Sequence, residues 1–198
     1  MQSLPSFLLF ALVAAVTPGP TNILVLANAS RHGPAAAVPM MFGASAGAAS
    51  VLLLVSSGLG VALAGHPLLR TLLGWAGLAW LSVLAWQLFR AAGVDSDQAG
   101  RDGRLGFIGT AGLQFINPKA WIMALAATGV FAVPEGGDVV SSLWYAGVFF
   151  LVALPGVAVW AWLGSGAARW ITRPESQRLF NRSMALLLLV SAWSTLLI

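Results

Sequence analysis

The stretch Val16-Thr17-Pro18-Gly19-Pro20-Thr21-Asn22 stands in the middle of an apolar segment that runs from about Ser6 to Ala27. About twenty apolar residues are enough to cross the roughly 30 Å hydrocarbon core of a bilayer as a helix. Pro18 and Pro20 lack amide hydrogens, and an interior proline costs a helix roughly 3 kcal/mol. In lipid, the carbonyls that they free must find partners in protein, ions or cavity water. The stretch therefore predicts a membrane span that is broken at its centre.

A second apolar segment, from Phe107 to Phe131, is interrupted at its centre by Asn117-Pro118-Lys119. Pro118 lies one hundred positions after Pro18, and each of these prolines follows a polar residue. Interrupted segments at matching places in two halves of a chain are typical of transporters, which expose backbone groups to the substrate at such breaks. The alternative interpretation is that both prolines are kinks that serve helix packing alone.

The composition is that of a membrane protein. Of 198 residues, 59% are hydrophobic and 8% are charged, and the mean hydropathy is +0.87. A soluble domain would carry about 25% charged residues. The chain has no cysteine, which excludes disulfides and thiolate metal sites. No basic region precedes the first apolar segment, so we expect that segment to be retained rather than cleaved as a signal peptide.

The apolar segments predict an all-α, polytopic membrane protein with one transmembrane domain, residues 1–198. Six spans are expected, at Ser6 to Ala27, Val38 to Leu63, Leu68 to Leu88, Phe107 to Phe131, Val139 to Leu163, and Leu179 to Ile198. They form two three-helix repeats, at about 1–90 and 107–198, joined by a polar cytoplasmic linker at about 91–106.

The basic residues predict the orientation of the spans. Eight of the ten Lys and Arg residues fall in the first, third and fifth connections: Arg31, Arg90, Arg101, Arg104, Arg169, Arg173, Arg178 and Arg182. Cytoplasmic loops collect Lys and Arg, so both termini should face outward. Three spans per half then place the halves in opposite orientations, which predicts an inverted repeat with its first and fourth helices broken at the membrane midplane. Because the positive charge lies in these loops, no nucleic-acid partner is expected.

Glycine and tryptophan are frequent in the predicted spans. Gly43-Ala44-Ser45-Ala46-Gly47 is a small-xxx-small pattern, which we interpret as a site of close helix packing. Gly-rich faces of this kind are also compatible with a homo-oligomer. Trp86, Trp160 and Trp193 are open to two interpretations, as interfacial belt residues or as part of a cavity wall.

Several motifs follow one another along the chain: Thr17-Pro18-Gly19-Pro20-Thr21-Asn22, Arg31-His32-Gly33, Gly43 to Gly47, Gly58-Leu59-Gly60, and Asn117-Pro118-Lys119. In this order they resemble the LysE/RhtB family of amino-acid exporters, over essentially the whole chain. Further segments look most like the branch that exports cysteine and O-acetylserine: Leu73 to Gly77, Leu84-Ala85-Trp86, Leu113-Gln114-Phe115, and Ala185 to Ala192. The resemblance implies secondary export of small amino acids from a bacterium across its cytoplasmic (inner) membrane.

The chain departs from the family pattern at Ala48. Many members carry an acidic or amide residue after the second glycine of the second-span motif. All six acidic residues of this chain fall in predicted loops: Asp95, Asp97, Asp102, Glu135, Asp138 and Glu175. If export is coupled to protons, a carboxylate in the membrane is not the relay.

Lys119 is the ionisable residue that the sequence places inside a span. A lysine at a helix centre costs roughly 2.5 to 3.5 kcal/mol on insertion, so it should face a cavity or a polar partner. The alternatives are a lysine that snorkels to an interface or is permanently bonded to exposed carbonyls. The predicted substrate-binding residues surround the two breaks: Thr17, Pro18, Gly19, Pro20, Asn22, Asn117, Pro118 and Lys119.

An amino-acid zwitterion fits these groups. Helix N-termini carry partial positive charge, so the half-helices that begin near Pro20 and Lys119 can receive the carboxylate, reinforced by the lysine. Carbonyls freed by the prolines, with Asn22, Asn117 and Thr17, can accept from the ammonium. Binding of a carboxylate beside Lys119 would link transport to the lysine's protonation, and this is the simplest proton coupling that the chain permits.

Other functions remain as alternatives. An exporter of another small metabolite or of a cation is the runner-up, although no Asp, Glu, His or Cys in a predicted span supplies metal ligands. An enzyme is not expected, because His32 and His66 lie at separate loop positions without a catalytic partner. No cofactor or resident metal is expected. A non-transporting membrane scaffold would explain the glycines and tryptophans but not the central lysine.

Overall fold

The computed structural model describes residues 4–59, 65–90, 105–131, 139–170 and 173–193, and these ranges form helices without any strand. The helices are α1 (Leu4–Val16), α2 (Pro20–His32), α3 (Pro34–Leu54), the short π-helix η1 (Val55–Leu59), α5 (Pro67–Arg90), α6 (Phe107–Ile116), α7 (Pro118–Phe131), α8 (Val139–Trp170) and α9 (Pro174–Trp193). The all-α prediction is confirmed for this part of the chain. The expected linker at about 91–106 lies almost wholly outside the described residues, as do Met1, Glu135 and Ile198.

Proline sets the start of most helices. It is the first residue of α2, α3, α5, α7 and α9. Proline suits this position because its fixed φ is helical and the missing amide would have no partner in the first turn. Gly33 makes the sharp turn between α2 and α3 at φ 82°, in the left-handed region that favours glycine, and its amide bonds to the Ala29 carbonyl at 2.9 Å.

The structure agrees with part of the predicted span layout. By length and apolar composition, α3 with η1 and α8 can each cross a membrane, and the pair α1 and α2, bent by 58°, makes a third span if counted as one. The helices α6 and α7 are each too short to cross alone. Helix α8 continues to Trp170, past the predicted end at Leu163, since the next proline is Pro174. The six-span layout stays a prediction.

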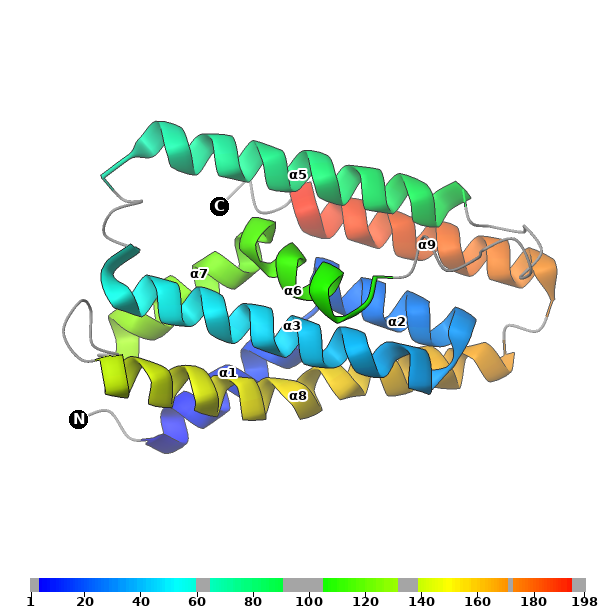
Figure 1. The fold of residues 1–198 in the computed structure, drawn as a ribbon. Coiled ribbons are helices and arrows are strands. Elements are labelled where there is room, and N and C mark those ends of the chain that lie inside the picture. Colours follow the sequence, from blue (N-terminus) through cyan, green and yellow to red (C-terminus); the bar gives the residue numbers. More distant parts are fainter. Residues whose placement is uncertain (1–3, 60–64, 91–104, 132–138, 171–172, 194–198) are drawn as a thin grey trace.

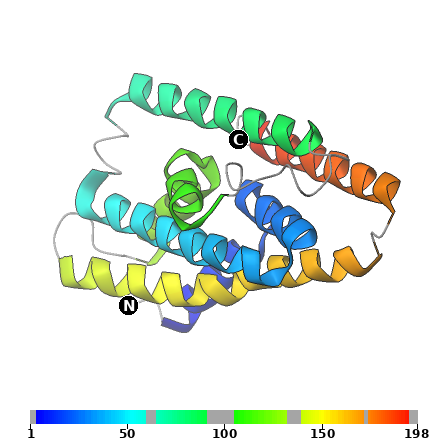
Figure 2. The same cartoon turned by 45° about the vertical axis from the view of Figure 1, so that its right-hand side comes forward.

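The helices pack in a bundle. Helices α5 and α9 lie side by side in both views, while α3 and α8 run together along the opposite side (Figures 1 and 2). The broken segments α1–α2 and α6–α7 pack against α3 and α8. A Cβ on Gly43 would overlap the Phe107 carbonyl, and one on Gly47 would overlap that of Ala111. The close helix packing predicted for this motif is confirmed, with α6 as the neighbour.

Two apolar clusters make up the core. Helices α2 and α6 contribute Ile23, Val25 and Leu113 to one cluster, whereas α1 and α7 contribute Phe7 and Ala127 to the other. Helices α3 and α8 contribute to both clusters. The two chain breaks therefore lie where one apolar cluster gives way to the other.

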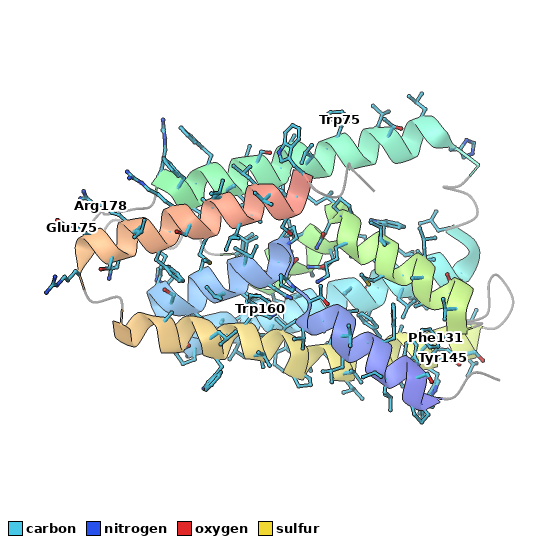
Figure 3. All side chains as sticks on the ribbon, turned by 180° about the vertical axis from the view of Figure 1, so that it is seen from behind. Trp75, Phe131, Tyr145, Trp160, Glu175 and Arg178 are labelled. Atoms are coloured by element: carbon cyan, nitrogen blue, oxygen red, sulfur yellow. The ribbon has the colours of Figure 1, made fainter. Side chains whose placement is uncertain are left out.

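The far end of the second cluster is closed by aromatic rings. Phe7 meets Phe131 and Tyr145 edge-on, with ring centroids 5.5 and 4.9 Å apart, which joins α1, α7 and α8 (Figure 3). Many large apolar side chains instead face outward, among them Trp75, Leu151 and Trp162. Such a surface is suited to lipid.

Candidate functional site

The first break separates α1, which ends at Val16, from α2, which begins at Pro20. The carbonyls at the end of α1 have new partners. Asn22 Nδ2 donates to the carbonyls of Ala15 and Thr17 at 2.8 and 2.9 Å. Trp160 Nε1 of α8 donates to that of Val16 at 3.0 Å, and its side chain lies beside the break in Figure 3. The break is therefore held by specific side chains, as burial of free carbonyls requires.

The second break is formed by one residue, Asn117, between α6 and α7. Its backbone is extended (φ −86°, ψ 109°), the conformation that a following proline imposes. Asn117 also caps α7, because its Oδ1 accepts the Lys119 amide at 3.1 Å and its carbonyl accepts the Ala120 amide at 3.0 Å. Trp121 Nε1 donates to the Phe115 carbonyl at 2.7 Å. This break, too, is closed by local hydrogen bonds.

A buried polar network joins the two breaks. Thr21 Oγ1 accepts from Gln114 Nε2 at 2.8 Å and from Asn117 Nδ2 at 3.1 Å, and Asn117 Nδ2 also lies 3.3 Å from Gln114 Oε1. All three side chains are buried. Since both acceptor positions of the Thr21 hydroxyl are occupied, any further partner must accept from it.

Lys119 crosses from the second break to the first. Its ammonium nitrogen, Nζ, donates to the Thr17 carbonyl and lies 3.5 Å from that of Pro18. These carbonyls end α1, where the helix dipole favours a cation. Gly19 makes room for the side chain, since a Cβ there would lie 2.8 Å from Lys119 Cδ and 3.1 Å from Nζ. The backbone of Gly19 is extended (φ −172°), which any residue can adopt, so a larger residue there would act by displacing the Lys119 side chain.

A cavity of about 60 Å³ lies beside the network. Its polar wall comes from the broken segments and includes Asn22, Thr21, Gln114, Asn117 and Lys119. Its other wall comes largely from α3 and α8, with the apolar residues Ala44, Ala48, Leu52, Phe149, Ala153 and Val157. The broken segments also contribute the apolar residues Ala14, Ala15, Ala120, Met123 and Ala124. The cavity therefore combines a cluster of charged and hydrogen-bonding groups with a larger apolar lining.

The two helix N-termini at the cavity differ. The first turn of α7 is occupied by Asn117, whereas α2 has no side-chain cap among the described residues. An anion in the cavity would therefore meet free amides at α2 and not at α7. From the sequence, both half-helices were predicted to receive the substrate's carboxylate at their N-termini.

The structure brings together only some of the predicted site residues. Gly19, Asn22, Asn117 and Lys119 line the cavity, and Thr17 and Pro18 supply carbonyls to Lys119. The Thr17 hydroxyl is turned away to the Val13 carbonyl at 2.6 Å. Pro18, Pro20 and Pro118 are not among the residues that line the cavity, and act by shaping the breaks.

Sequence reasoning missed Gln114 and Ser45, and it did not count Thr21 among the binding residues. A glutamine inside a predicted span was the available signal for Gln114. Of the tryptophans left open, Trp160 holds the first break, while Trp86 and Trp193 are each about half exposed and lie outside the cavity wall.

Comparison with known proteins identifies the family. The LysE type translocator family matches residues 12–197. A cysteine/O-acetylserine efflux protein of Salmonella choleraesuis (strain SC-B67) is 34% identical over 165 residues, which cover 81% of this chain and 82% of that protein. The protein of the same name from Escherichia coli O1:K1 / APEC is 32% identical over 193 residues, or 96% and 95% of the two chains. No solved structure matches this chain. The chain belongs to the LysE type translocator family.

Proposed function

We propose that the protein exports small amino acids or their derivatives, such as cysteine or O-acetylserine, by secondary transport through the cavity between the two breaks. The family and the names of the similar efflux proteins support amino-acid export. The observation that carries the site is the reach of Lys119 from one break to the carbonyls of the other. A scaffold protein would need neither this crossing lysine nor a half-polar cavity beside it.

The geometry suggests how a zwitterion binds. The ammonium of Lys119 now sits at the carbonyls of Thr17 and Pro18, where an amino-acid ammonium would also fit. On binding, the substrate's ammonium takes this place, and Lys119 turns to its carboxylate. The uncapped first turn of α2 and the Thr21 hydroxyl offer further donors to that carboxylate. Lys119 thus stands in for the substrate when the cavity is empty.

The cavity must widen to admit a substrate. Its volume of about 60 Å³ is less than half of the roughly 150 Å³ of a cavity that binds a benzene molecule. A second hollow of about 390 Å³, against α1, shares the wall residues Ala14 and Met123 with the cavity. We propose that these two side chains separate the site from an access route.

Exchange of the Lys119 partner, from the backbone carbonyls to the substrate's carboxylate, links substrate binding to the charge of the lysine. This link offers a route for proton coupling.

We propose that the chain spans the inner membrane six times as two inverted repeats, with both termini outside. In this cysteine-free chain, single cysteines placed at Glu135 and Arg101 should be labelled from opposite sides of the membrane, with Glu135 outside. Membrane-impermeant maleimide on intact cells and on inverted vesicles measures this directly. Labelling of both positions from one side would remove the inverted repeat.

Transport itself is tested by counterflow in proteoliposomes. Vesicles loaded with unlabelled cysteine or O-acetylserine should accumulate the labelled compound at least several-fold over protein-free vesicles, and bulky amino acids should compete poorly because the apolar wall leaves little room. Accumulation of other metabolites or of cations in place of amino acids would favour the alternative exporters. An absence of counterflow with every compound tested would favour a scaffold.

A further inference from the structure

Ser45 is a buried serine whose hydroxyl has no hydrogen-bond partner. It lies on α3, is 1% exposed, and carries the buried side-chain polar atom that is unsatisfied among the described residues. Leaving a buried hydroxyl unpaired destabilises a protein, because the hydroxyl loses its bonds to water without gaining others. An isolated unsatisfied group in a native structure needs an explanation, and a ligand that bonds to it is one.

Other serines in these helices bond to their own backbone. Ser50 Oγ, on the same helix, donates to the Ala46 carbonyl at 2.8 Å, and Ser82 and Ser165 make the same bond four residues back, each at 2.8 Å. This bond is the usual way for a helical serine to satisfy its hydroxyl in an apolar setting. Ser45 has the equivalent option at Met41 but does not use it.

Ser45 lines the proposed substrate cavity, on the part of its wall that α3 contributes. Its neighbours on that wall, from α3 and α8, are the apolar residues Ala44, Ala48, Leu52, Phe149, Ala153 and Val157. The charged ends of a zwitterion are drawn to the wall formed by Lys119 and Asn22. A substrate held by its charged ends there has its side chain left to face the α3 and α8 part of the wall, which includes Ser45.

We propose that Ser45 is a specificity-determining residue that hydrogen-bonds the polar atom of a small substrate side chain. This inference rests on the proposed function. Ser45 selects amino acids whose β-carbon carries a hydroxyl, thiol or acyloxy group over aliphatic amino acids of the same size. Beside such a substrate, the Ser45 hydroxyl gains a hydrogen-bond partner, which no protein group among the described residues provides. An aliphatic substrate leaves the hydroxyl unpaired, and the site discriminates by that penalty.

The test compares cysteine with 2-aminobutyrate, in which a methyl group replaces the thiol. In counterflow under reducing conditions, the parent protein should favour cysteine, and Ser45→Ala should lower the cysteine to 2-aminobutyrate ratio about three- to tenfold, the effect of one buried hydrogen bond. Ser45→Cys, which keeps a weak donor of similar size, should give an intermediate ratio. Ser50→Ala is the matched control and should leave the ratio unchanged, because its hydroxyl bonds to its own helix.

The ratio is independent of protein yield, since both compounds are measured in the same vesicles. Ser45→Ala should also keep or raise the parent's Tm, because it removes a buried hydroxyl that has no protein partner. An unchanged ratio in Ser45→Ala, or an equal loss for both compounds with a lower Tm, would show that Ser45 is structural. If the parent transports neither compound, the proposed function fails and this inference with it; if the parent transports both without preference, only this inference fails.

Discussion

Replacing Lys119 with methionine is expected to lower export at least tenfold. Methionine keeps much of the length of the side chain but removes the ammonium, which bonds to the Thr17 and Pro18 carbonyls and, in the proposed mechanism, turns to the substrate's carboxylate. A hydrogen bond to a charged group contributes about 1.5–3 kcal/mol, or roughly 10- to 150-fold in binding. Lys119→Arg should retain part of the activity, because it keeps the charge with a different geometry. Initial rates of counterflow at equal membrane abundance measure the effect.

Thr17→Val provides a matched control for the lysine. The structure uses the Thr17 carbonyl and turns the Thr17 hydroxyl to Val13, so this variant should export within about twofold of the parent, less than the effect of one hydrogen bond. If Lys119→Met exports like the parent with the same pH dependence, the lysine is a permanent structural partner of the carbonyls. Proton coupling must then involve other groups.

The breaks could be predicted from sequence because proline acts locally. Pro18, Pro20 and Pro118 remove amide hydrogens wherever they stand in a helix, and α1 and α6 end beside them as expected. The residues that satisfy the freed carbonyls could not be predicted in this way. Trp160 reaches Val16 from 144 positions away, and that contact depends on how α8 lies beside α1.

The same limit applies to the polar network. Thr21 and Gln114 are 93 positions apart, and nothing in the period of either helix shows that their side chains meet. Lys119 was identified because a charge inside a span is costly anywhere in the membrane, but its partners at Thr17 and Pro18 depend on the fold. Ser45 could not be identified from the sequence, because a serine inside a small-xxx-small motif is typical of helix packing. Only the structure shows that its hydroxyl has no hydrogen-bond partner among the described residues.

Some glycine roles could be predicted from the sequence, and others could not. The packing role of Gly43 and Gly47 followed from their spacing, and the structure adds that α6 is the partner. Gly19 was expected to act at the site through the exposed backbone of the break, yet its extended φ of −172° is open to any residue. What glycine provides there is room for the Lys119 side chain, a contact from a distant part of the chain.

Replacing Pro118 with alanine is expected to lower export tenfold or more while the protein still inserts. An interior proline costs a helix roughly 3 kcal/mol, so its removal lets Asn117 adopt helical geometry and joins α6 to α7. Asn117 would then lose its bonds to Thr21 and to the Lys119 amide, and Lys119 would turn with its helix away from Thr17. Counterflow at equal abundance, with circular dichroism for the added helix, measures both consequences.

Pro155→Ala is the matched control for this change. Pro155 also lies inside a helix, but α8 runs unbroken from Val139 to Trp170, and Pro155 is exposed and does not line the cavity. This variant should therefore keep export within about twofold of the parent, less than the effect of one hydrogen bond. Full export by Pro118→Ala would mean that the second break is a packing kink and that the Asn117 network serves stability alone. An equal loss in both variants would trace the effect to proline in membrane helices generally, whereas loss in Pro118→Ala alone would assign it to the break that carries Lys119.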